Sequence, residues 1–260
     1  MTELRLTDQV IVVTGGTQGL GEAVCLEAAA SGAKGIVFCG RNDVQGRSVA
    51  RAIESKGAIP LFVKADLVNP DDCQRVMEAC DQRFGRLHGL VNAAGVTDRG
   101  TIDNTTVELW DRIFDINTRA PFILMQEAIR IMKRENHGGS IVNMITMSSH
   151  GGQPFITAYS ASKGALATLT KNIAHAVRWE QIRVNGINLG WMDSPGEHVT
   201  QLNDGNPSDW LESAEERQPF KRLLKPRDIA TLAVYLLSDE SRLLTGALID
   251  YDQNVMGAYG

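Results

Sequence analysis

Short apolar segments alternate along this chain with longer segments whose apolar residues recur at helical spacing. Strands that alternate with helices are typical of a parallel sheet with helices on both faces. This order therefore predicts an α/β fold with a doubly wound parallel sheet. The seven strands that we expect cover residues 10–14, 35–40, 61–65, 89–92, 140–145, 183–188 and 247–251.

The length of 260 residues suits one large α/β domain with a substantial core. No linker rich in proline, glycine and serine separates two halves, so we expect residues 1–260 to form a single domain. Residues 193–219 resist assignment, because they are polar, carry three prolines and are long for a connection. We expect either a mobile lid over the substrate or a surface excursion with one short helix.

The charge of the chain argues against two classes of partner. A formal net charge of −5 gives no basic surface of the kind that nucleic acid or an anionic membrane binds. Residues 1–8 lack the charged-then-apolar order of a secretory signal, and no apolar stretch approaches the roughly 20 residues of a membrane span. We therefore expect a cytoplasmic protein. The four cysteines form no close CxxC pair, which predicts buried, reduced thiols and no metal site.

A glycine-rich turn follows the first expected strand. It reads Thr-Gly-Gly-Thr-Gln-Gly-Leu-Gly over residues 14–21 and leads into an alanine-rich helix. Glycines at such a turn let the backbone approach a pyrophosphate, and the helix N-terminus offers unpaired N–H groups to the anion. The turn indicates a dinucleotide site, although its spacing differs from the common G-x-G-x-x-G pattern. The residues expected to bind the cofactor here are Gly15, Thr17, Gln18, Gly19, Leu20 and Gly21.

The end of the second strand indicates which dinucleotide binds. An acidic residue in this region would bind the ribose hydroxyls of NAD(H), whereas this chain has Arg41 followed by Asn42. The guanidinium of Arg41 suits the 2′-phosphate of NADP(H), which is therefore favoured. Because the glycine turn carries Gln18 and no second basic residue, use of NAD(H) stays open.

The segment that carries chemistry is Tyr-Ser-Ala-Ser-Lys at residues 159–163, where a helix is expected to begin. Residues four apart on a helix share one face, so Tyr159 and Lys163 become neighbours. An adjacent cation lowers the pKa of a tyrosine, and general acid–base catalysis works best with a pKa near the working pH. The pair therefore predicts a proton relay.

Three further motifs accompany the glycine turn and the Tyr159–Lys163 pair. They are Asp66-Leu67, Asn92-Ala93-Ala94-Gly95 and Asn117. With these five motifs in this order, the chain resembles the short-chain dehydrogenase/reductase family over essentially its whole length. The resemblance implies that Asp66 and Leu67 contact the adenine, that residues 92–95 adjoin the cofactor, and that Asn117 supports a proton-relay water.

The resemblance also implies a fold and a reaction. The family has one Rossmann-type sheet of seven parallel strands, which agrees with the strand count above. Its enzymes transfer a hydride reversibly between nicotinamide and a CH–OH or carbonyl carbon. Tyr159 is then expected to exchange the hydroxyl proton, while Lys163 lowers the tyrosine pKa and holds the nicotinamide ribose.

The chain departs from the family pattern at the serine that binds the substrate oxygen. The position thirteen residues before the tyrosine is Thr146, and Ser148 follows two residues later, so either hydroxyl is expected to serve. Near the C-terminus, residues 250–254 replace the usual V-D-G-G, which alters either the pocket floor or a subunit contact. The cofactor-binding residues expected after the sixth strand are Gly190, Met192 and Ser194.

Polar residues near the expected pocket favour a sugar or polyol as the substrate. They are Arg99, His150, Gln153 and Asp193, and Trp191 either lines the pocket or packs elsewhere. A 3-ketoacyl or small-ketone substrate fits them somewhat less well. The alternative of a different class is a catalytically inactive, NADP-binding regulatory or scaffold protein, but the retained Tyr159, Lys163 and Asn117 favour the enzyme.

The resemblance finally implies a homotetramer or homodimer. Its contacts would involve the helix that carries Tyr159 and the preceding helix over residues 121–134. Four residues supply more apolar surface than one buried stripe needs: Ala165, Leu166, Leu169 and Ile173.

Overall fold

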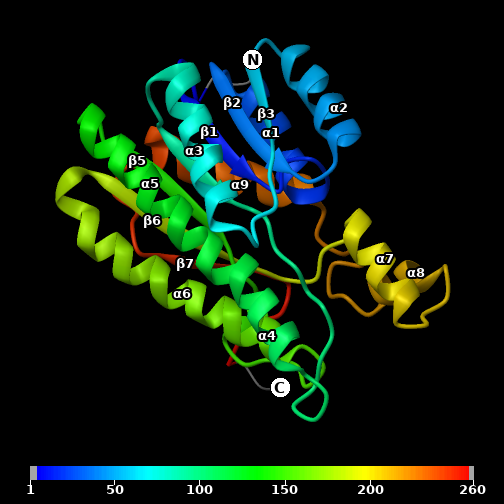
Figure 1. Ribbon diagram of the computed structural model, residues 1–260. Coiled ribbons are helices and arrows are strands. Elements are labelled where there is room, and N and C mark those ends of the chain that lie inside the picture. Colours follow the sequence, from blue (N-terminus) through cyan, green and yellow to red (C-terminus); the bar gives the residue numbers. More distant parts are fainter. Residues whose placement is uncertain (1–4, 258–260) are drawn as a thin grey trace.

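Seven parallel strands form the centre of the molecule (Figure 1). The computed structural model describes residues 5–257, so residues 1–4 of the polar segment 1–8 and residues 258–260 lie outside the described part. The strands are β1 (Val10–Thr14), β2 (Gly35–Gly40), β3 (Ile59–Lys64), β4 (Gly89–Asn92), β5 (Gly139–Met144), β6 (Ile182–Leu189) and β7 (Leu248–Tyr251). They lie in the order β3-β2-β1-β4-β5-β6-β7. The predicted fold class is confirmed.

The ends of four strands differ from the prediction by one or two residues. The largest difference is in β3, which begins at Ile59 because Ile59 and Pro60 pair with Gly35 and Ile36 of β2. Proline lacks an N–H and is normally confined to edge strands. Pro60 is tolerated because β3 is an edge strand of the sheet. The sequence shows the proline but not the position of its strand.

The helices cover the two faces of the sheet. On one face lie α3 (Pro70–Phe84), α5 (Ala120–Glu135) and α6 (Thr157–Val177), and on the other lie α1 (Gly19–Ala30), α2 (Asp43–Glu54) and α9 (Pro226–Leu237). Alternate residues of β1 point to opposite faces of the sheet. Val10 and Val12 pack in the core on the side of α3, α5 and α6, and Ile11 and Val13 pack in the core on the side of α1, α2 and α9. A strand buried on both faces must be apolar throughout, which explains the continuous apolar segments.

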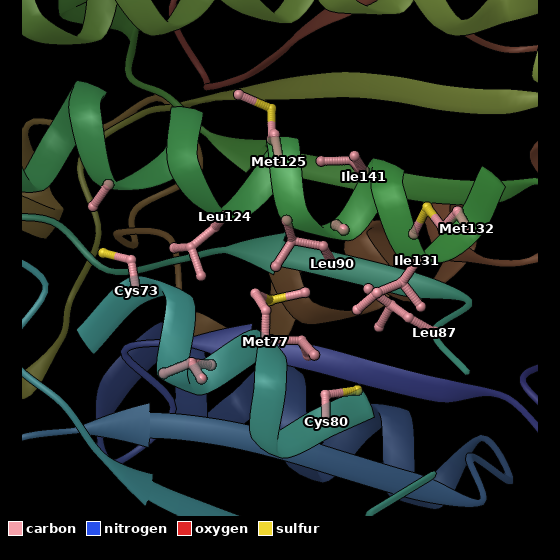
Figure 2. Close-up of a cluster of buried hydrophobic side chains, with 14 of the residues drawn as sticks. Cys73, Met77, Cys80, Leu87, Leu90, Leu124, Met125, Ile131, Met132 and Ile141 are labelled. Atoms are coloured by element: carbon pink, nitrogen blue, oxygen red, sulfur yellow. The ribbon is translucent and has the colours of Figure 1, made fainter. Parts of the chain in front are cut away.

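The core beneath α3 and α5 is densely filled with aliphatic side chains (Figure 2). Met77 of α3, Leu90 of β4 and Leu124 of α5 meet there, and all three are completely buried. Burial of one such side chain contributes about 1.5–3 kcal/mol relative to exposure. Two of the cysteines, Cys73 and Cys80, lie in the same cluster, and all four cysteines are buried and unpaired, as expected.

The remaining helices lie towards the carboxyl ends of the strands. They are α4 (Val107–Phe114), α7 (Pro195–Asn203) and α8 (Trp210–Glu216). Figure 1 shows α7 and α8 set apart from the helices that cover the sheet. The strand order reverses between β1 and β4, and ligands of open α/β sheets bind in the crevice that opens at such a point. In the described residues, no helix is long and apolar enough to cross a membrane.

Candidate active site

A cavity of about 1260 Å³ lies at the reversal point and extends from the glycine turn to Tyr159 and α7. The predicted cofactor residues that line it are Gly15, Thr17, Gln18, Gly19, Leu20, Gly21, Arg41, Asp66, Leu67, Ala93, Ala94, Gly95, Gly190, Met192 and Ser194. The predicted catalytic and substrate residues that line it are Arg99, Thr146, Ser148, Gln153, Tyr159, Lys163 and Trp191. The structure therefore brings together residues that are spread over most of the sequence.

The glycine turn has the shape of a phosphate cradle. Gly15 and Gly19 adopt φ values of +65° and +56°, which side chains rarely allow. A Cβ at Gly21 would lie 2.2 Å from the carbonyl oxygen of Gly15, so the backbone must be bare there. Gln18 precedes the first turn of α1 and makes no side-chain cap. The N–H groups of that turn are thus available to an anion, and the turn fits the pyrophosphate of a dinucleotide.

Two of the predicted cofactor residues do not line the cavity. The side chain of Asn42 accepts hydrogen bonds from the N–H groups of Val44 and Gln45 and caps α2. Asn92 is buried and donates to Asn143 Oδ1 at 2.8 Å. The Asn42 side chain therefore caps a helix, and the Asn92 side chain links β4 to β5 through its Nδ2, while Asn92 Oδ1 has no hydrogen-bond partner among the described residues.

Asn117 also lies behind the cavity wall. It sits in a π-helical turn, Asp115–Arg119, between α4 and α5. Its Nδ2 donates to Val96 O at 2.9 Å and to Ser162 Oγ at 3.1 Å, and its Oδ1 accepts from the N–H of Val96. A Cβ at Gly95 would lie 3.4 Å from both Asn117 Oδ1 and Lys163 Nζ, so these two residues lie close together. Such π-helical turns are frequent at functional sites.

Tyr159 and Lys163 lie one turn apart near the start of α6, as their spacing predicts. Lys163 is 4% exposed, and its Nζ donates to the carbonyl oxygen of Met144 at the end of β5, 2.7 Å away. This contact fixes the ammonium beside the sheet. The lysine is therefore held by the fold as well as by its helix.

Burial dominates the pKa values of the pair. It raises the pKa of Tyr159 to about 12, although a hydrogen bond with Thr146 opposes the rise. It lowers the pKa of Lys163 to about 8. Desolvation is the largest cause of the raised pKa of Tyr159, and the groups that lower this pKa are Thr146 and Arg99, so the lowering expected from Lys163 stays a prediction. At neutral pH the phenol is protonated.

The structure distinguishes the two hydroxyls that the sequence left open. Thr146 is 8% exposed and its side chain hydrogen-bonds Tyr159. Ser148 lies further along the same wall, and its Oγ donates to Gln153 Oε1 at 3.5 Å. The Thr146 hydroxyl is thus the one that directly adjoins the phenol, in agreement with its position thirteen residues before the tyrosine.

Arg99, Trp191 and Gln153 line the part of the cavity beyond Tyr159. Arg99 forms an ion pair with Asp204 at 2.9 Å, and its guanidinium lies over the ring of Phe155. Trp191 both lines the cavity and stacks on Trp210, with ring centroids 5.8 Å apart. Both alternatives for Trp191 are therefore true at once, because it lines the cavity and also packs on Trp210.

His150 does not line the cavity, contrary to expectation. Its Nε2 lies 2.9 Å from Asp250 Oδ1 and 3.0 Å from Asn188 Nδ2. Asp250 at the C-terminal end of the sheet thus engages the imidazole. Because this contact joins residues 100 positions apart, no local sequence pattern could reveal it.

The sequence analysis missed the polar residues that α7 contributes to the cavity wall. Glu197, Thr200 and Gln201 lie there at helical spacing. A signal was present: Ser194 with Glu197 three residues later is typical of a helix start, and Ser194 Oγ indeed accepts from the N–H of Glu197. Within residues 5–257, no group of three or more His, Cys, Asp or Glu side chains could hold a metal ion.

Comparison with known proteins agrees with this site. The family model described as enoyl-(acyl carrier protein) reductase matches residues 15–253. The NADP-dependent (R)-specific alcohol dehydrogenase of Lentilactobacillus kefiri is 32% identical over 94% of each chain. Galactitol 2-dehydrogenase of Agrobacterium fabrum is 32% identical over 96% of this chain and 98% of its own.

A solved structure agrees over the whole length. L-sorbose reductase of Gluconobacter frateurii, in complex with NADPH and L-sorbose, has a TM-score of 0.92 and 28% identity, covering 99% of this chain and 100% of its own. The chain belongs to the short-chain dehydrogenase/reductase family. The resemblance that rested on five sequence motifs is confirmed, and with it the prediction of an enzyme of this family.

The buried Lys163 gives a prediction about stability. Burial lowers its pKa from the usual 10.5 to about 8, so the cost of burying the charged form disappears as the pH rises between these values. From pH 7.5 to 9.5 we expect the unfolding free energy of the wild type to gain about 2 kcal/mol relative to Lys163→Met. Urea denaturation at both pH values measures the difference.

The comparison with Lys163→Met removes the contribution of the cysteines to the pH dependence of the unfolding free energy. Burial raises the pKa values of Cys25, Cys39, Cys73 and Cys80, which lowers stability above pH 9 in both proteins alike. Stability curves of wild type and variant that run parallel across this interval would contradict the assignment.

Proposed function

We propose that this protein is an NADP(H)-dependent oxidoreductase that interconverts a secondary alcohol and a carbonyl. The observation that carries the proposal is one cavity that holds both the glycine cradle and the hydroxyl pair of Thr146 and Tyr159. The nicotinamide, when bound, supplies or accepts the hydride. The protein's own groups must then position the substrate oxygen and move its proton.

Tyr159 is the proton donor and acceptor in this proposal, and Thr146 orients the substrate oxygen. With a pKa of about 12, Tyr159 carries its proton at neutral pH, which is the state that protonates a carbonyl oxygen during reduction. Oxidation requires the phenolate, so it should gain from alkaline pH. Lys163 is assigned to the nicotinamide ribose and to the proton path, together with Asn117 behind it.

Arg41 supports the choice of NADP(H). It lines the cavity on the side of the glycine turn, at the end of β2. The next acidic residue along the chain, Asp43, is engaged by Lys64 at 2.9 Å and does not line the cavity. No acidic group of this strand end thus competes with a 2′-phosphate. The name of the NADP-dependent alcohol dehydrogenase and the NADPH in the L-sorbose reductase complex support the same cofactor.

A sugar or polyol is the proposed substrate. The wall beyond Tyr159 is rich in hydrogen-bonding groups, among them Gln153, Arg99 and Gln201. The relatives that act on galactitol and L-sorbose support the same class. The description of the matching family model favours instead a reductase of acyl-carrier substrates, which remains the second candidate.

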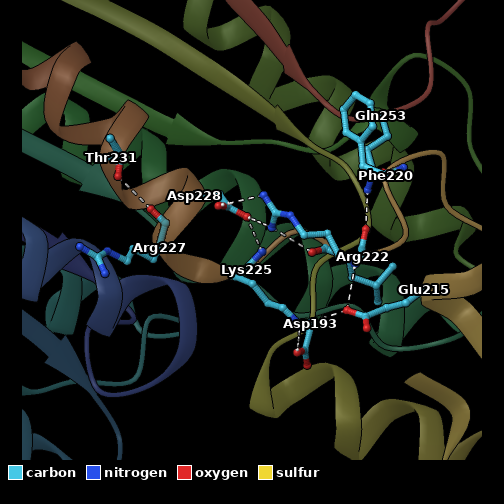
Figure 3. Close-up of polar contacts among 10 residues, drawn as sticks. Asp193, Glu215, Phe220, Arg222, Lys225, Arg227, Asp228, Thr231 and Gln253 are labelled. Atoms are coloured by element: carbon cyan, nitrogen blue, oxygen red, sulfur yellow. Dashed lines mark hydrogen bonds and ion pairs between the residues drawn. The ribbon is translucent and has the colours of Figure 1, made fainter. Parts of the chain in front are cut away.

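We propose further that residues 193–219 form the lid over this substrate. α7 and α8 occupy this segment, and α7 supplies part of the cavity wall. Lys225 before α9 anchors the segment through ion pairs with Asp193 at 2.7 Å and Glu215 at 3.1 Å (Figure 3). Asp193 therefore serves as an anchor and does not line the cavity.

The cytoplasmic location remains a prediction.

A tyrosine without its hydroxyl provides the first test. Tyr159→Phe should reduce kcat by a factor of about 10²–10⁴, because the proton relay is lost, while the Kd for NADPH stays within about threefold. Tyr235→Phe, on α9 and outside the cavity wall, is the control. Absorbance of NAD(P)H is followed with sugars, polyols, 3-ketoacyl esters and cyclic ketones. Equal turnover in Tyr159→Phe and wild type would disprove the mechanism.

The cofactor assignment predicts a selective loss. Arg41→Ala should raise the Kd for NADPH by roughly 10- to 100-fold, because charge-assisted hydrogen bonds contribute about 1.5–3 kcal/mol, and should change the Kd for NADH little. Arg51→Ala, at the exposed end of α2, should leave both values unchanged. Fluorescence titration gives the constants. An equal effect on the two cofactors would argue against a 2′-phosphate contact.

We also propose that the protein is a homotetramer or homodimer. Leu166 is core, so it adds nothing to an interface, but Phe122 of α5 and Trp110 of α4 are 43% and 38% exposed. Aromatic side chains are enriched in subunit contacts, and these two lie exposed on successive helices of the chain. Light scattering should therefore give at least twice the mass of one chain. The mass of a single chain would exclude the proposal.

A further inference from the structure

Glu197 presents a carboxylate to the substrate end of the cavity. It lies in the first turn of α7, which Ser194 caps, and it lines the cavity together with Tyr159 and Gln201. The proposed function assigns it no role.

Neutral donors hold one oxygen of this carboxylate. Glu197 Oε1 accepts from Trp191 Nε1 at 2.8 Å and from Gln201 Nε2 at 2.6 Å. Gln201 is itself held, because its Oε1 accepts from Asn206 Nδ2 at 2.7 Å, and it is 8% exposed. This chain of hydrogen bonds fixes the orientation of the carboxylate. Among the described residues, no donor engages Oε2.

Glu197 differs from two other carboxylates of the same wall. Asp204 is paired with Arg99 at 2.9 Å, and Asp98 with Arg112 at 2.5 Å. In the part of the chain that the structure describes, no cation lies within ion-pair distance of Glu197. Its negative charge is therefore not neutralised, and it acts on the reacting group: the carboxylate contributes to the raised pKa of Tyr159.

A free carboxylate oxygen in a partly enclosed cavity has a definite preference for ligands. A hydroxyl that donates to it forms a charge-assisted hydrogen bond, which is stronger than one between neutral groups. An apolar substrate would leave the oxygen without a partner, and an anionic substrate would be repelled. The position of Glu197 on the cavity wall shared with Tyr159 means that such a hydroxyl belongs to the molecule whose oxygen Tyr159 protonates.

We infer that Glu197 is the residue that determines substrate specificity, with its free oxygen accepting a hydrogen bond from a second hydroxyl of a neutral, polyhydroxylated substrate. This inference rests on the proposed function and extends it, because it names the group that recognises the polyol. It excludes carboxylate-bearing substrates. The tether of Glu197 to Trp191 and Gln201 sets the position of the second hydroxyl.

The test compares three substrates in Glu197→Gln and wild type. With NADP⁺ we expect the ratio of kcat/KM for sorbitol to that for cyclohexanol to fall at least tenfold, mainly through KM. The relative kcat/KM for 3-hydroxybutyrate should rise, because the repelling charge is gone. The pH dependence of kcat should shift to lower pH, because the loss of the charge lowers the Tyr159 pKa. An unchanged ratio, or an equal loss on all three substrates, overturns the inference.

Two further variants separate the effect of the charge of Glu197 from the effect of its side-chain length. Glu197→Asp keeps the charge on a shorter side chain, so it should lose sorbitol affinity yet still discriminate against 3-hydroxybutyrate. Glu212→Gln removes a carboxylate from the exposed face of α8 and should keep the wild-type ratios. If Glu197→Asp accepts 3-hydroxybutyrate as well as Glu197→Gln does, the charge is not the cause and the inference fails.

Calorimetry distinguishes failure of this inference from failure of the proposed function. Sorbitol is titrated into the wild type and into Glu197→Gln, each saturated with NADPH, which cannot accept a hydride, so that binding is measured without turnover. If no alcohol is turned over, the proposed function fails, but sorbitol binding that depends on Glu197 still supports the recognition site. If cyclohexanol is oxidised and sorbitol binds both proteins alike, the proposed function stands and the inference is overturned. Glucosamine binding at least tenfold tighter than sorbitol would also overturn it, because the ligand class would then be cationic.

Discussion

The contact between the end of β1 and the end of β4 is the constraint on which the rest of the site depends. The hydroxyl of Thr14 accepts hydrogen bonds from the N–H groups of Ala93 and Ala94, at 3.0 and 3.1 Å. At the same point the bare Cα of Gly15 lies against Ala94, where a Cβ would approach to 2.9 Å. The chain connections that follow β1 and β4 diverge on either side of this contact, so the crevice opens here. The glycine turn and residues 93–95 both face this crevice.

The reacting end of the cavity is held by buried polar groups that belong to separate elements. Lys163 is tied to the end of β5, while Asn117 in the π-turn reaches Ser162 on α6. Ser162 in turn donates to the backbone carbonyl of Tyr159. A buried network of this kind is rigid when its members are satisfied. Tyr159 therefore occupies a defined position, and its environment, which burial dominates, keeps its proton in place.

Local features of the sequence predicted much of the fold and most of the residues that the structure brings to the cavity. The seven strands, the glycine turn and the one-turn separation of Tyr159 and Lys163 depend on neighbours in sequence, so they could be found by spacing alone. The ends of some strands differ from the prediction, because pairing with a neighbouring strand decides where a strand begins and ends. Pro60 is an example, since it belongs to β3 through its pairing with β2. The expected binding roles of Asn42 and His150 stay predictions, because neither residue lines the cavity: Asn42 caps the helix that follows it, and His150 binds Asp250, a contact across 100 positions that no local spacing describes.

The sequence by itself determined the family, the sheet and the reacting pair, because each follows from periodicity or from a compact motif. Only the tertiary structure decided the environment of that pair. Desolvation raises the pKa of Tyr159 and lowers that of Lys163, and desolvation depends on everything that packs around them. It also decided that Thr146 adjoins the phenol and that Glu197, 38 positions beyond Tyr159, lines the same cavity, because only folding brings distant residues together.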